Sequence, residues 1–546
     1  MPRKDYTALF LLALLLRVGV AWVQHSPGFM DAEYYFIGGQ ALAQGEGFNE
    51  QILWNYLDDP DGLPHPSHGY WMPLASMLAA LGMWIARSPG FEAAQWVFVL
   101  IGSLFPPLTA ALGYAFTRSR LSAWISGGIA ALAGFYLPFF TTTETFGLYA
   151  VLGAAFFLLL PASRHGDAER AEKHRAAASF LVPLALGLIA GLMHLARAEG
   201  LLWLGFAMPG ALLAPPSQRE NSPHARGLKG KAGGALSRIL LVLAGYALVM
   251  LPWFWRNMSV FGAPLAPGGS RALWLTDYNE LFIYPASLLT FERWWASGLS
   301  AILDARLWAL GQNLQRALAE QGMIFLAPFI LLGLWARRRD FRVQMAALIW
   351  LVNFALMTLV FPCQGARGGF FHASAALLPV FWAVAPLGLE RVLAWVVQRR
   401  PSWQLQRARK MFFGALLAFV VLFTAFAAGA KLLPQGETPA RWEQNRRTYQ
   451  ALEAALTAFD PAPADVVLTI NPPGYFAYTQ RPAIAIPDGT PATVLEVADR
   501  YGARYLLLEE SHPEGLNALY AAPENPPSGL AYLTTAAGTH VFQVTR

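Results

Sequence analysis

The chain has 546 residues, of which 55% are hydrophobic and only 14% are charged. A soluble globular domain carries about 25% charged residues, so the composition excludes an ordinary soluble protein and indicates burial in lipid. The single cysteine, Cys363, excludes an internal disulfide and a zinc site built from several sulfur ligands, and the net charge of +6 is no signal for nucleic acid.

Apolar stretches of about 18 to 25 residues recur along the chain, which is typical of a polytopic helical membrane protein. The first lies within MPRKDYTALFLLALLLRVGVAWV and has no small-residue cleavage site before Gln24, so we interpret it as an uncleaved span. We predict eleven spans, at residues 7–24, 93–117, 121–140, 145–162, 178–196, 201–214, 239–256, 322–337, 342–360, 370–391 and 411–432.

The basic residues decide whether the apolar segment 71–87 also crosses the membrane. Lysine and arginine cluster at Arg3-Lys4, Arg118/Arg120, Arg164–Arg175, Arg219–Arg238, Arg337–Arg342 and Arg399–Lys410. If 71–87 does not cross, every one of these clusters lies on the cytoplasmic side, as the positive-inside rule requires. We therefore predict a cytoplasmic N-terminus and a helix at 71–87 that lies in the outer interface.

The outer face then collects the polar motifs of the chain. It receives the first outer loop (25–92), the second long outer loop (257–321) and the shorter segments TTTETFG (141–147), ARAEG (196–200) and PCQGARGGFFH (362–372). Acids, tryptophans and histidines concentrate there, whereas the inner loops are basic. We predict a multi-pass protein of the cell membrane, inner or plasma, whose functional site is extracytoplasmic.

The chain changes character after residue 433. Helical spacing in ARWEQNRRTYQALEAALTAF and TPATVLEVADRYG alternates with strand-like ADVVLTI, AIAIPDG and ARYLLLEE, before THVFQVTR closes the chain. Thr490 and Gly502 fit the N-cap and the stop of the second helix. We therefore predict a transmembrane domain at 1–433 and a small extracytoplasmic α/β domain at 434–546.

Five motifs on the predicted outer face resemble, in chain order, those of a known family: MDAEYYFIGGQALAQGEGF, HPSHGYWMPL, TTTETFGLYAVL, LARAEGLLWL and PWFWRNMSVFGAPLAPGGS. Together they are similar to the GT-C membrane glycosyltransferases, in the branch with protein O-mannosyltransferases and the lipid A aminoarabinose transferase. The chain departs from that pattern at Asp31-Ala32-Glu33, where many members have adjacent acids. It also has GARGGFF where they often have Glu-Arg-Tyr.

The resemblance implies a GT-C fold and an inverting glycosyltransferase. Such an enzyme moves a hexosyl or pentosyl group from a polyprenyl-phosphate-linked donor in the membrane to a hydroxyl or amine of a glycan, lipid or protein acceptor. Nucleic acid is not expected as a partner. No metal ligand is assigned, but members divide between metal-dependent and metal-independent enzymes, so a divalent cation, Mg or Mn, stays open as a cofactor.

This transfer needs a base for the acceptor proton and positive charge for the departing phosphate. Asp31, a few residues past the first span, is the expected base, and Glu144 in TTTETF is the second catalytic candidate because ionisable residues at membrane depth are often functional. As alternatives, Asp31 caps the following helix, and Thr141 with Glu144 forms a capping box. Glu33 points to another helix face and is kept as a substrate contact.

Arginine suits a phosphate because its planar fork is permanently charged. Arg256, at the end of a span, is the first candidate, followed by Arg197 and Arg367. For Arg256 the alternatives are snorkelling to the interface and pairing with an acid between spans. Glu199 stands two residues from Arg197 and is not expected to pair with it. His65 is expected to contact substrate or phosphate, with a plain interfacial role or a metal site as alternatives. The other predicted substrate-binding residues lie in the same motifs: Tyr35, His68, Tyr70 and Asn257.

Three other functions fit a membrane protein of this kind. A transporter or flippase for a lipid-linked substrate often shows internal repeats and broken helices near the midplane, whereas here no repeat is evident and the ionisable residues gather at the outer ends of spans. A binding or assembly protein would act through the tail domain, which has no nucleotide-binding glycine pattern. An oligosaccharide ligase on the same fold differs in cavity size, which the sequence does not give.

Overall fold

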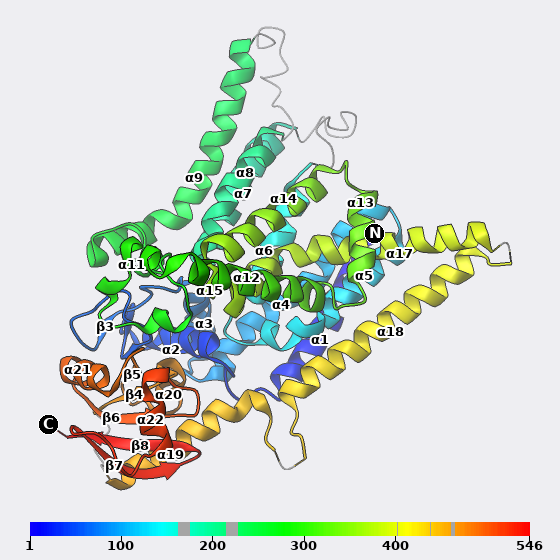
Figure 1. The fold of residues 1–546 in the computed structure, drawn as a ribbon. Coiled ribbons are helices and arrows are strands. Elements are labelled where there is room, and N and C mark those ends of the chain that lie inside the picture. The colour runs from blue at the N-terminus through cyan, green and yellow to red at the C-terminus, as the bar shows by residue number, and fades with distance from the viewer. Residues whose placement is uncertain (162–174, 214–227, 401, 437, 460–464, 546) are drawn as a thin grey trace.

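The computed structural model describes residues 1–161, 175–213, 228–400, 402–436, 438–459 and 465–545. Figure 1 shows a body of helices with a small α/β unit at the C-terminal end of the chain. The helices of the body are α1 (Arg3–Ala21), α2 (Met30–Gln44), α3 (Leu74–Ala86), α4 (Phe91–Thr117), α5 (Arg120–Leu132), α6 (Phe146–Leu159), α7 (Arg175–Ala196), α8 (Leu201–Leu212), α9 (Leu228–Phe261), α10 (Gly268–Arg271), α11 (Phe291–Ala296), α12 (Gly298–Arg316), α13 (Ala327–Ala336), α14 (Phe341–Ala355), α15 (Pro362–Gln364), α16 (Phe370–Ser374), α17 (Leu378–Arg399) and α18 (Leu405–Leu432).

Short 3₁₀ and π turns interrupt or join these helices, and several of them border the site described below. They are η1 (Gly134–Thr141), η2 (Ala198–Gly200), η4 (Asn279–Phe282), η5 (Ala286–Leu288), η6 (Ala317–Gln321), η7 (Leu356–Val360), η8 (Gly365–Gly369) and η9 (Ala375–Leu377). Single-turn π segments inside helices are frequent at functional sites, which makes η7 and η8 of interest.

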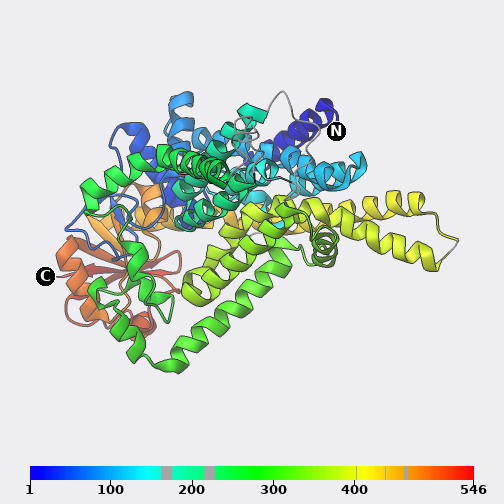
Figure 2. The ribbon, with the colours of Figure 1, turned by 90° about the horizontal axis from the view of Figure 1, so that it is seen from above.

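Apolar packing places α17 inside the body and α18 on its outside. The most apolar window of the continuous helical stretch that ends with α17 is 94% buried, whereas that of α18 is only 28% buried. Trp382 of α17 is fully buried in the main apolar core. Figure 2 shows α17 and α18 extending together away from the C-terminal unit. The outward apolar face of α18 is therefore available to lipid.

Five described helices are long and apolar enough to cross a membrane, judged by length and composition. A sixth is counted if α5 and η1, which meet at 58°, form one broken span. Shorter apolar helices, among them α6, α8 and α13, cover other predicted spans. The structure thus has the several apolar helices of a membrane protein, while the count of eleven spans stays a prediction.

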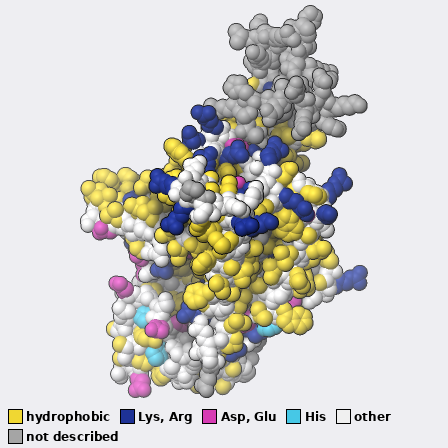
Figure 3. All heavy atoms as spheres, turned by 90° about the vertical axis from the view of Figure 1, so that its right-hand side faces the viewer, with side chains coloured by type: hydrophobic (Ala, Val, Ile, Leu, Met, Phe, Trp, Pro, Cys, Tyr) yellow, Lys and Arg dark blue, Asp and Glu magenta, His cyan; other side chains and the backbone are white. Residues whose placement is uncertain are grey.

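The charged side chains are unevenly distributed over the surface. In Figure 3 most of the visible lysine and arginine side chains lie on the half of the molecule nearer the grey segments, whereas the visible acids and histidines lie mostly toward the opposite end. This separation agrees with the orientation predicted from the basic clusters, which stays a prediction. Of the predicted basic clusters at 164–175 and 219–238, residues 164–174 and 219–227 lie outside the described residues.

The first outer loop folds into two helices and three short strands, β1 (Asn49–Glu50), β2 (Ile52–Leu53) and β3 (His65–Pro66). Helix α2 ends at Gly45, whose positive φ of 85° stops it. Its glycine pair allows α3 to approach closely, because a Cβ on Gly39 would lie 2.6 Å from Cβ of Ala79. The helix predicted at 71–87 is α3, and its position relative to the membrane stays a prediction.

The C-terminal unit is a six-stranded sheet with helices, as the tail pattern predicts. Its chain-order elements are η10 (Arg441–Glu443), α19 (Gln444–Phe459), β4 (Val466–Thr469), α20 (Pro472–Thr479), β5 (Ala483–Ala485), α21 (Pro491–Tyr501), β6 (Ala503–Leu508), η11 (Glu514–Leu516), α22 (Asn517–Ala521), β7 (Leu530–Ala536) and β8 (Thr539–Val544). Thr490 caps α21 in a capping box with Thr493, and Gly502 ends that helix with φ of 70°. Strands β4, β5 and β6 pair in parallel, and β8 and β7 extend the sheet antiparallel.

One strand of this sheet comes from the first outer loop. The strand order is β2-β5-β4-β6-β8-β7, and β2 pairs in parallel with β5 through Ile52 and Ala483. Nearby, the indole of Trp442 donates to the Ser26 carbonyl at 2.9 Å, and the Glu443 carboxylate accepts from the His25 amide at 2.9 Å. The sheet therefore joins residues from both sides of the predicted domain boundary at 433–434.

Candidate functional site

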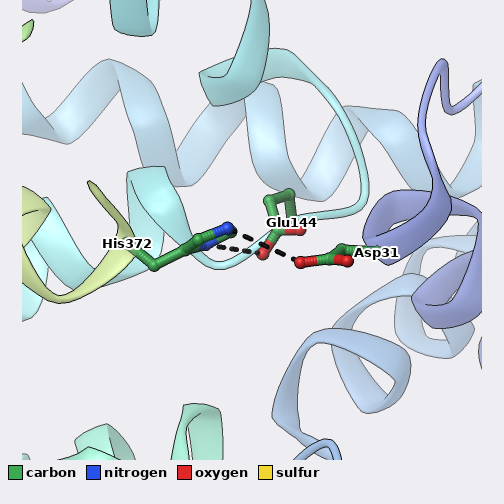
Figure 4. A group of neighbouring side chains, drawn as sticks. All are labelled: Asp31, Glu144 and His372. Carbon is green, nitrogen blue, oxygen red and sulfur yellow. Dashed lines mark ion pairs between the residues drawn. The ribbon is translucent and has the colours of Figure 1, made fainter. Parts of the chain in front are cut away.

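Three ionisable side chains from distant parts of the chain meet beside α2. Asp31 comes from the first turn of α2, Glu144 from the turn before α6, and His372 from α16. Oδ2 of Asp31 lies 3.5 Å from Nε2 of His372, and Oε1 of Glu144 lies 3.6 Å from Nδ1 of the same ring. Figure 4 shows the three side chains pointing toward one another. One ligand atom of each lies within 4.8 Å of those of the other two.

The local structure explains how two acids reach this position. The N-cap of α2 is Phe29 rather than Asp31, and no side chain caps this helix, so Asp31 lies in the first turn where the helix dipole favours an acid. Glu144 makes no capping box with Thr141. Instead its Oε1 accepts from the backbone amide and the hydroxyl of Thr145, at 2.6 and 2.8 Å. The His372 ring stacks on Phe146, with centroids 4.0 Å apart.

Burial controls the protonation of the two acids. It raises the pKa of Asp31 to about 6, against the opposing charge of Arg197. It raises the pKa of Glu144 to about 8, with the charge of Asp31 adding to the effect. Burial thus brings the pKa of both acids toward neutral pH, and an acid with a pKa near the working pH suits a general base. A cation at this point would lower both values.

Asp31 and His372 face a cavity of about 360 Å³. Its aromatic wall includes Tyr35 of α2 and Trp54 and Trp71 of the first outer loop. The Asp31 side chain is 28% exposed, whereas those of His372 and Glu144 are 8% and 0% exposed. Asp31 is therefore the member of the trio that a molecule in the cavity would reach. The lining also includes Tyr70, Arg197, Glu199, Tyr278, Leu356, Met357, Phe361 and Arg367.

Two of the three predicted phosphate arginines lie in this cavity, and they differ in their partners. Arg197 is largely buried and donates from Nε to Glu199, so the expectation that these two do not pair is wrong. The reason is local: Arg197 is extended and the tight turn η2 folds Glu199 back onto it. Arg367 is exposed, lies 4.9 Å from the centroid of the Tyr278 ring, and has no ion pair among the described residues. Arg367 is thus the cavity cation that is not neutralised.

Arg256 and Asn257, predicted as substrate contacts, lie outside the cavity lining. The Arg256 guanidinium donates to the carbonyls of Phe48 and Ser67, at 3.2 and 2.8 Å, and lies 4.8 Å from the centroid of the Trp253 ring. Asn257 donates from Nδ2 to the Pro264 carbonyl at 3.1 Å. In this structure Arg256 fastens the first outer loop to the end of α9, and Asn257 holds the segment that follows α9.

The two predicted histidines also hold the loop together. His65 is buried, with Nε2 2.8 Å from the Ile52 carbonyl, and lies 3.3 Å from Glu50 and 3.6 Å from Asp58. His68 is buried between two serine hydroxyls, and burial lowers the pKa of His68 to about 3, so its ring is neutral. Neither lines the cavity, whereas the predicted Tyr35 and Tyr70 both do.

Glu33 faces away from the cavity and into the C-terminal unit. Its carboxylate is fully buried and accepts from Asn445 at 3.0 Å, Asn471 at 2.8 Å and Tyr478 at 2.8 Å. Burial raises the pKa of Glu33, and these three donors counteract the rise. The prediction that Glu33 points to another face than Asp31 matches this placement, and in this structure its partners are all protein groups.

His372, Trp54, Trp71 and Tyr278 belong to the site but were not predicted. His372 ends the outer segment PCQGARGGFFH, so its side of the membrane was predicted, but no spacing links it to Asp31 or Glu144. Trp71 lies within the quoted motif HPSHGYWMPL, and Trp54 precedes this motif in the first outer loop. Aromatic belts at membrane interfaces are the commoner explanation for such residues, and the sequence holds no signal that separates them from cavity walls.

No protein-family model matches the chain, and no curated protein matches its sequence. Solved structures do share its fold. The oligosaccharyltransferase of Archaeoglobus fulgidus tethered with an acceptor peptide has a TM-score of 0.56 at 14% identity, and the match covers 100% of this chain and 74% of that one. ArnT from Cupriavidus metallidurans bound to undecaprenyl phosphate has a TM-score of 0.52 at 14% identity, over 99% of this chain and 98% of ArnT.

A third structure bears on the acidic trio. It is the Archaeoglobus enzyme in complex with Zn and sulfate, with a TM-score of 0.53 at 14% identity over 98% of this chain and 72% of that one. Another structure of the Archaeoglobus enzyme is in complex with an inhibitory peptide and a dolichol-phosphate, so structures of both neighbours hold a polyprenyl phosphate. At this identity the likeness concerns the fold, and the fold predicted from the five motifs is confirmed.

Proposed function

We propose that this chain, which has the fold of the GT-C membrane glycosyltransferases, transfers a sugar from a polyprenyl-phosphate-linked donor to an acceptor hydroxyl or amine at the Asp31 cavity. The single observation that carries this proposal is the composition of the cavity. It combines a carboxylate with a pKa near neutrality, an unneutralised arginine and an aromatic wall. Those are the base, the phosphate contact and the stacking surface that the reaction needs.

Asp31 is the base in this proposal. The acceptor oxygen or nitrogen attacks the anomeric carbon, its proton passes to the Asp31 carboxylate, and the bond from the anomeric carbon to the phosphate oxygen breaks on the opposite side. The sugar is thereby inverted, and the electron pair leaves with the polyprenyl phosphate. Oδ2 of Asp31 is the oxygen near His372, which leaves Oδ1 for the acceptor.

Arg367 is the proposed contact for the donor phosphate. Its guanidinium is exposed at the cavity beside Leu356, Met357 and Phe361, an apolar surface that suits the first isoprene units of the carrier. Arg197 is held by Glu199, so it contributes charge to the same cavity without being free to follow the leaving group. This moves the principal phosphate role from Arg256, the first candidate by sequence, to Arg367.

Replacing Arg367 by glutamine is expected to raise the KM for the polyprenyl-phosphate sugar roughly 10- to 100-fold, the order of one charge-assisted hydrogen bond. Arg367→Lys keeps the charge without the planar fork and should fall in between. Arg293→Gln is the matched control, since Arg293 lies in another predicted outer segment, the second long outer loop, and pairs with Glu280 at 2.9 Å outside the cavity. Steady-state kinetics measure all three, and an unchanged KM in Arg367→Gln contradicts the assignment.

The trio also fits a divalent cation. Oε2 of Glu144 and Nδ1 of His372 are buried without a hydrogen-bond partner among the described residues, and two carboxylates with an imidazole suit Zn or Mn. Glu144 and His372 would hold the ion together with Oδ2 of Asp31. Bound there, it would supply positive charge next to the developing phosphate charge.

Removal of divalent cations tests this site. Incubation with a chelator is expected to lower turnover, and readdition of Mn, Mg or Zn to restore it for the preferred ion. Metal analysis of the purified protein gives a readout apart from activity, because Glu144→Gln and His372→Ala should each lower the metal content while Glu46→Gln, an exposed residue, should not. Metal content and chelator response equal to the wild type in both variants would remove the cation from the proposal.

An oligosaccharide ligase on the same fold is the second candidate, because the Archaeoglobus oligosaccharyltransferase covers the whole chain. The cavity volume favours a single sugar, since about 360 Å³ is near the lower end of ligand pockets, roughly 300–1,000 Å³. Consumption of purified polyprenyl-phosphate monosaccharides, compared with polyprenyl-linked oligosaccharides, tests the choice. Translocation of either lipid across a vesicle membrane without consumption would instead support the flippase.

A further inference from the structure

A second cavity, which we call the α18 groove, lies where α18 meets η1 and the start of the C-terminal unit. Its volume is about 400 Å³, and it is lined by Phe29, Phe135, Phe139, Phe426, Lys431 and Arg441 among others. It shares no lining residue with the Asp31 cavity. A chain of ring contacts, Phe139 to Phe146 and Phe146 to His372, forms the wall between the groove and the catalytic trio.

Two cations, Lys431 and Arg441, lie at one end of the α18 groove and have no acidic partner among the described residues. The Lys431 ammonium lies 5.0 Å from the centroid of Phe135 and 5.1 Å from that of Phe139. Arg441 is exposed and close enough for its charge to act on Lys431. Among the described residues neither forms an ion pair, and Glu320, whose charge also reaches Lys431, is already paired with Arg316 at 2.9 Å. Two adjacent positive charges repel each other, so an anion between them is stabilised.

Below these cations, α18 presents an apolar stripe to the outside. Phe419, Leu422 and Phe426 are 61%, 66% and 77% exposed, and their spacing of three and four residues places them on one helix face. The stripe leads to Phe426 in the groove lining. A snorkelling lysine would extend its ammonium group into water. The ammonium group of Lys431 instead lies over the rings of Phe135 and Phe139, which line the groove.

We propose that the α18 groove binds an anionic phospholipid, with its acyl chains on the Phe419–Phe426 stripe and its phosphate between Lys431 and Arg441. Two unpaired cations, an aromatic cavity and an exposed apolar stripe on the same helix match the charge and the shape of such a lipid. The site goes beyond the proposed transfer reaction and does not depend on it, because it is walled off from Asp31.

Lipid retention by the purified full-length protein tests the groove. Native mass spectrometry with dioleoyl phosphatidylglycerol is expected to show a retained adduct that dioleoyl phosphatidylcholine does not replace. The double variant Lys431→Gln/Arg441→Gln should retain it roughly tenfold more weakly, the order of losing two charge contacts. A photoactivatable phosphatidylglycerol should crosslink within 423–442 in the wild type and not in the double variant.

Two further variants separate this site from general attraction between lipid and charge. Ala427→Phe fills the groove without changing any charge, since Ala427 is part of its lining, and should weaken retention as well. Arg306→Gln is the matched control, because Arg306 also lies over an aromatic ring, 5.3 Å from the Trp294 centroid, but lines neither this groove nor the Asp31 cavity. Equal retention in the double variant and the wild type overturns the proposal. Crosslinking outside residues 423–442 also overturns it. Retention of inorganic phosphate or undecaprenyl phosphate in place of phosphatidylglycerol has the same meaning.

Discussion

Replacing Asp31 by asparagine is expected to abolish sugar transfer while leaving donor binding intact. Asparagine has the same shape and cannot take the acceptor proton, and loss of a general base costs roughly 10²- to 10⁴-fold in rate. The donor phosphate is assigned to Arg367, so binding should persist. Turnover of a polyprenyl-phosphate sugar and its equilibrium binding, measured on the same preparation, give the two readouts.

Two comparisons make the Asp31 experiment decisive. Asp304→Asn removes an exposed carboxylate of α12 outside the cavity and should keep the wild-type rate. Asp31→Glu restores a carboxylate one carbon further out and should recover part of the activity. A wild-type rate in Asp31→Asn would end the base assignment, and loss of both turnover and donor binding would make Asp31 a binding residue instead.

Replacing Glu33 by alanine is expected to loosen the C-terminal unit from α2. Its carboxylate accepts from Asn445, Asn471 and Tyr478, which would all be left without this partner in a buried position. Truncating a buried charged partner of this kind costs about 2 to 5 kcal/mol. Thermal unfolding should show the loss of stability, and limited proteolysis should cut faster in the connection at 433–440.

Glu46→Ala is the control for this experiment, since Glu46 is exposed just after the end of α2 and should change neither measurement. Glu33→Gln should lose less stability than Glu33→Ala, because the carbonyl oxygen of glutamine still accepts a hydrogen bond. Some stability should still be lost, because the amide group of glutamine faces the donors of Asn445 and Asn471. An unchanged cleavage pattern and melting temperature in Glu33→Ala would show that the remaining contacts of the unit suffice.

The sequence predicts those features of the site that depend on residues close together in the chain. Asp31 and Glu144 stand in short acidic segments at predicted span ends, so topology and motif order predict that both lie on the outer face. His372 does not follow, because its approach to the two acids depends on how three distant segments pack. Arg256 has the sequence context of a phosphate ligand, yet the carbonyls of Phe48 and Ser67 take its donors, and no local pattern foretells a backbone partner.

The same distinction applies to the fold. Helix α21 is predictable residue by residue, because its Thr490 cap and Gly502 stop act within one turn of the chain. Strand β2 is not, because it has only two residues and its identity as a strand comes from its partner β5. The boundary at 433–434 marks the change of composition along the chain, while the sheet joins both sides of it.

The strand that the first outer loop gives to the C-terminal sheet has a consequence for biosynthesis. Asn471, which donates to Glu33, lies 438 residues after Glu33 in the chain. The Tyr56 hydroxyl donates to a backbone carbonyl that lies 429 residues after Tyr56. During synthesis the loop that carries Asp31 is made early, but its neighbours arrive only as the chain is completed. The candidate site around Asp31 is therefore expected to be completed late, and a chain that terminates before residue 471 would leave strand β2 without its partner β5.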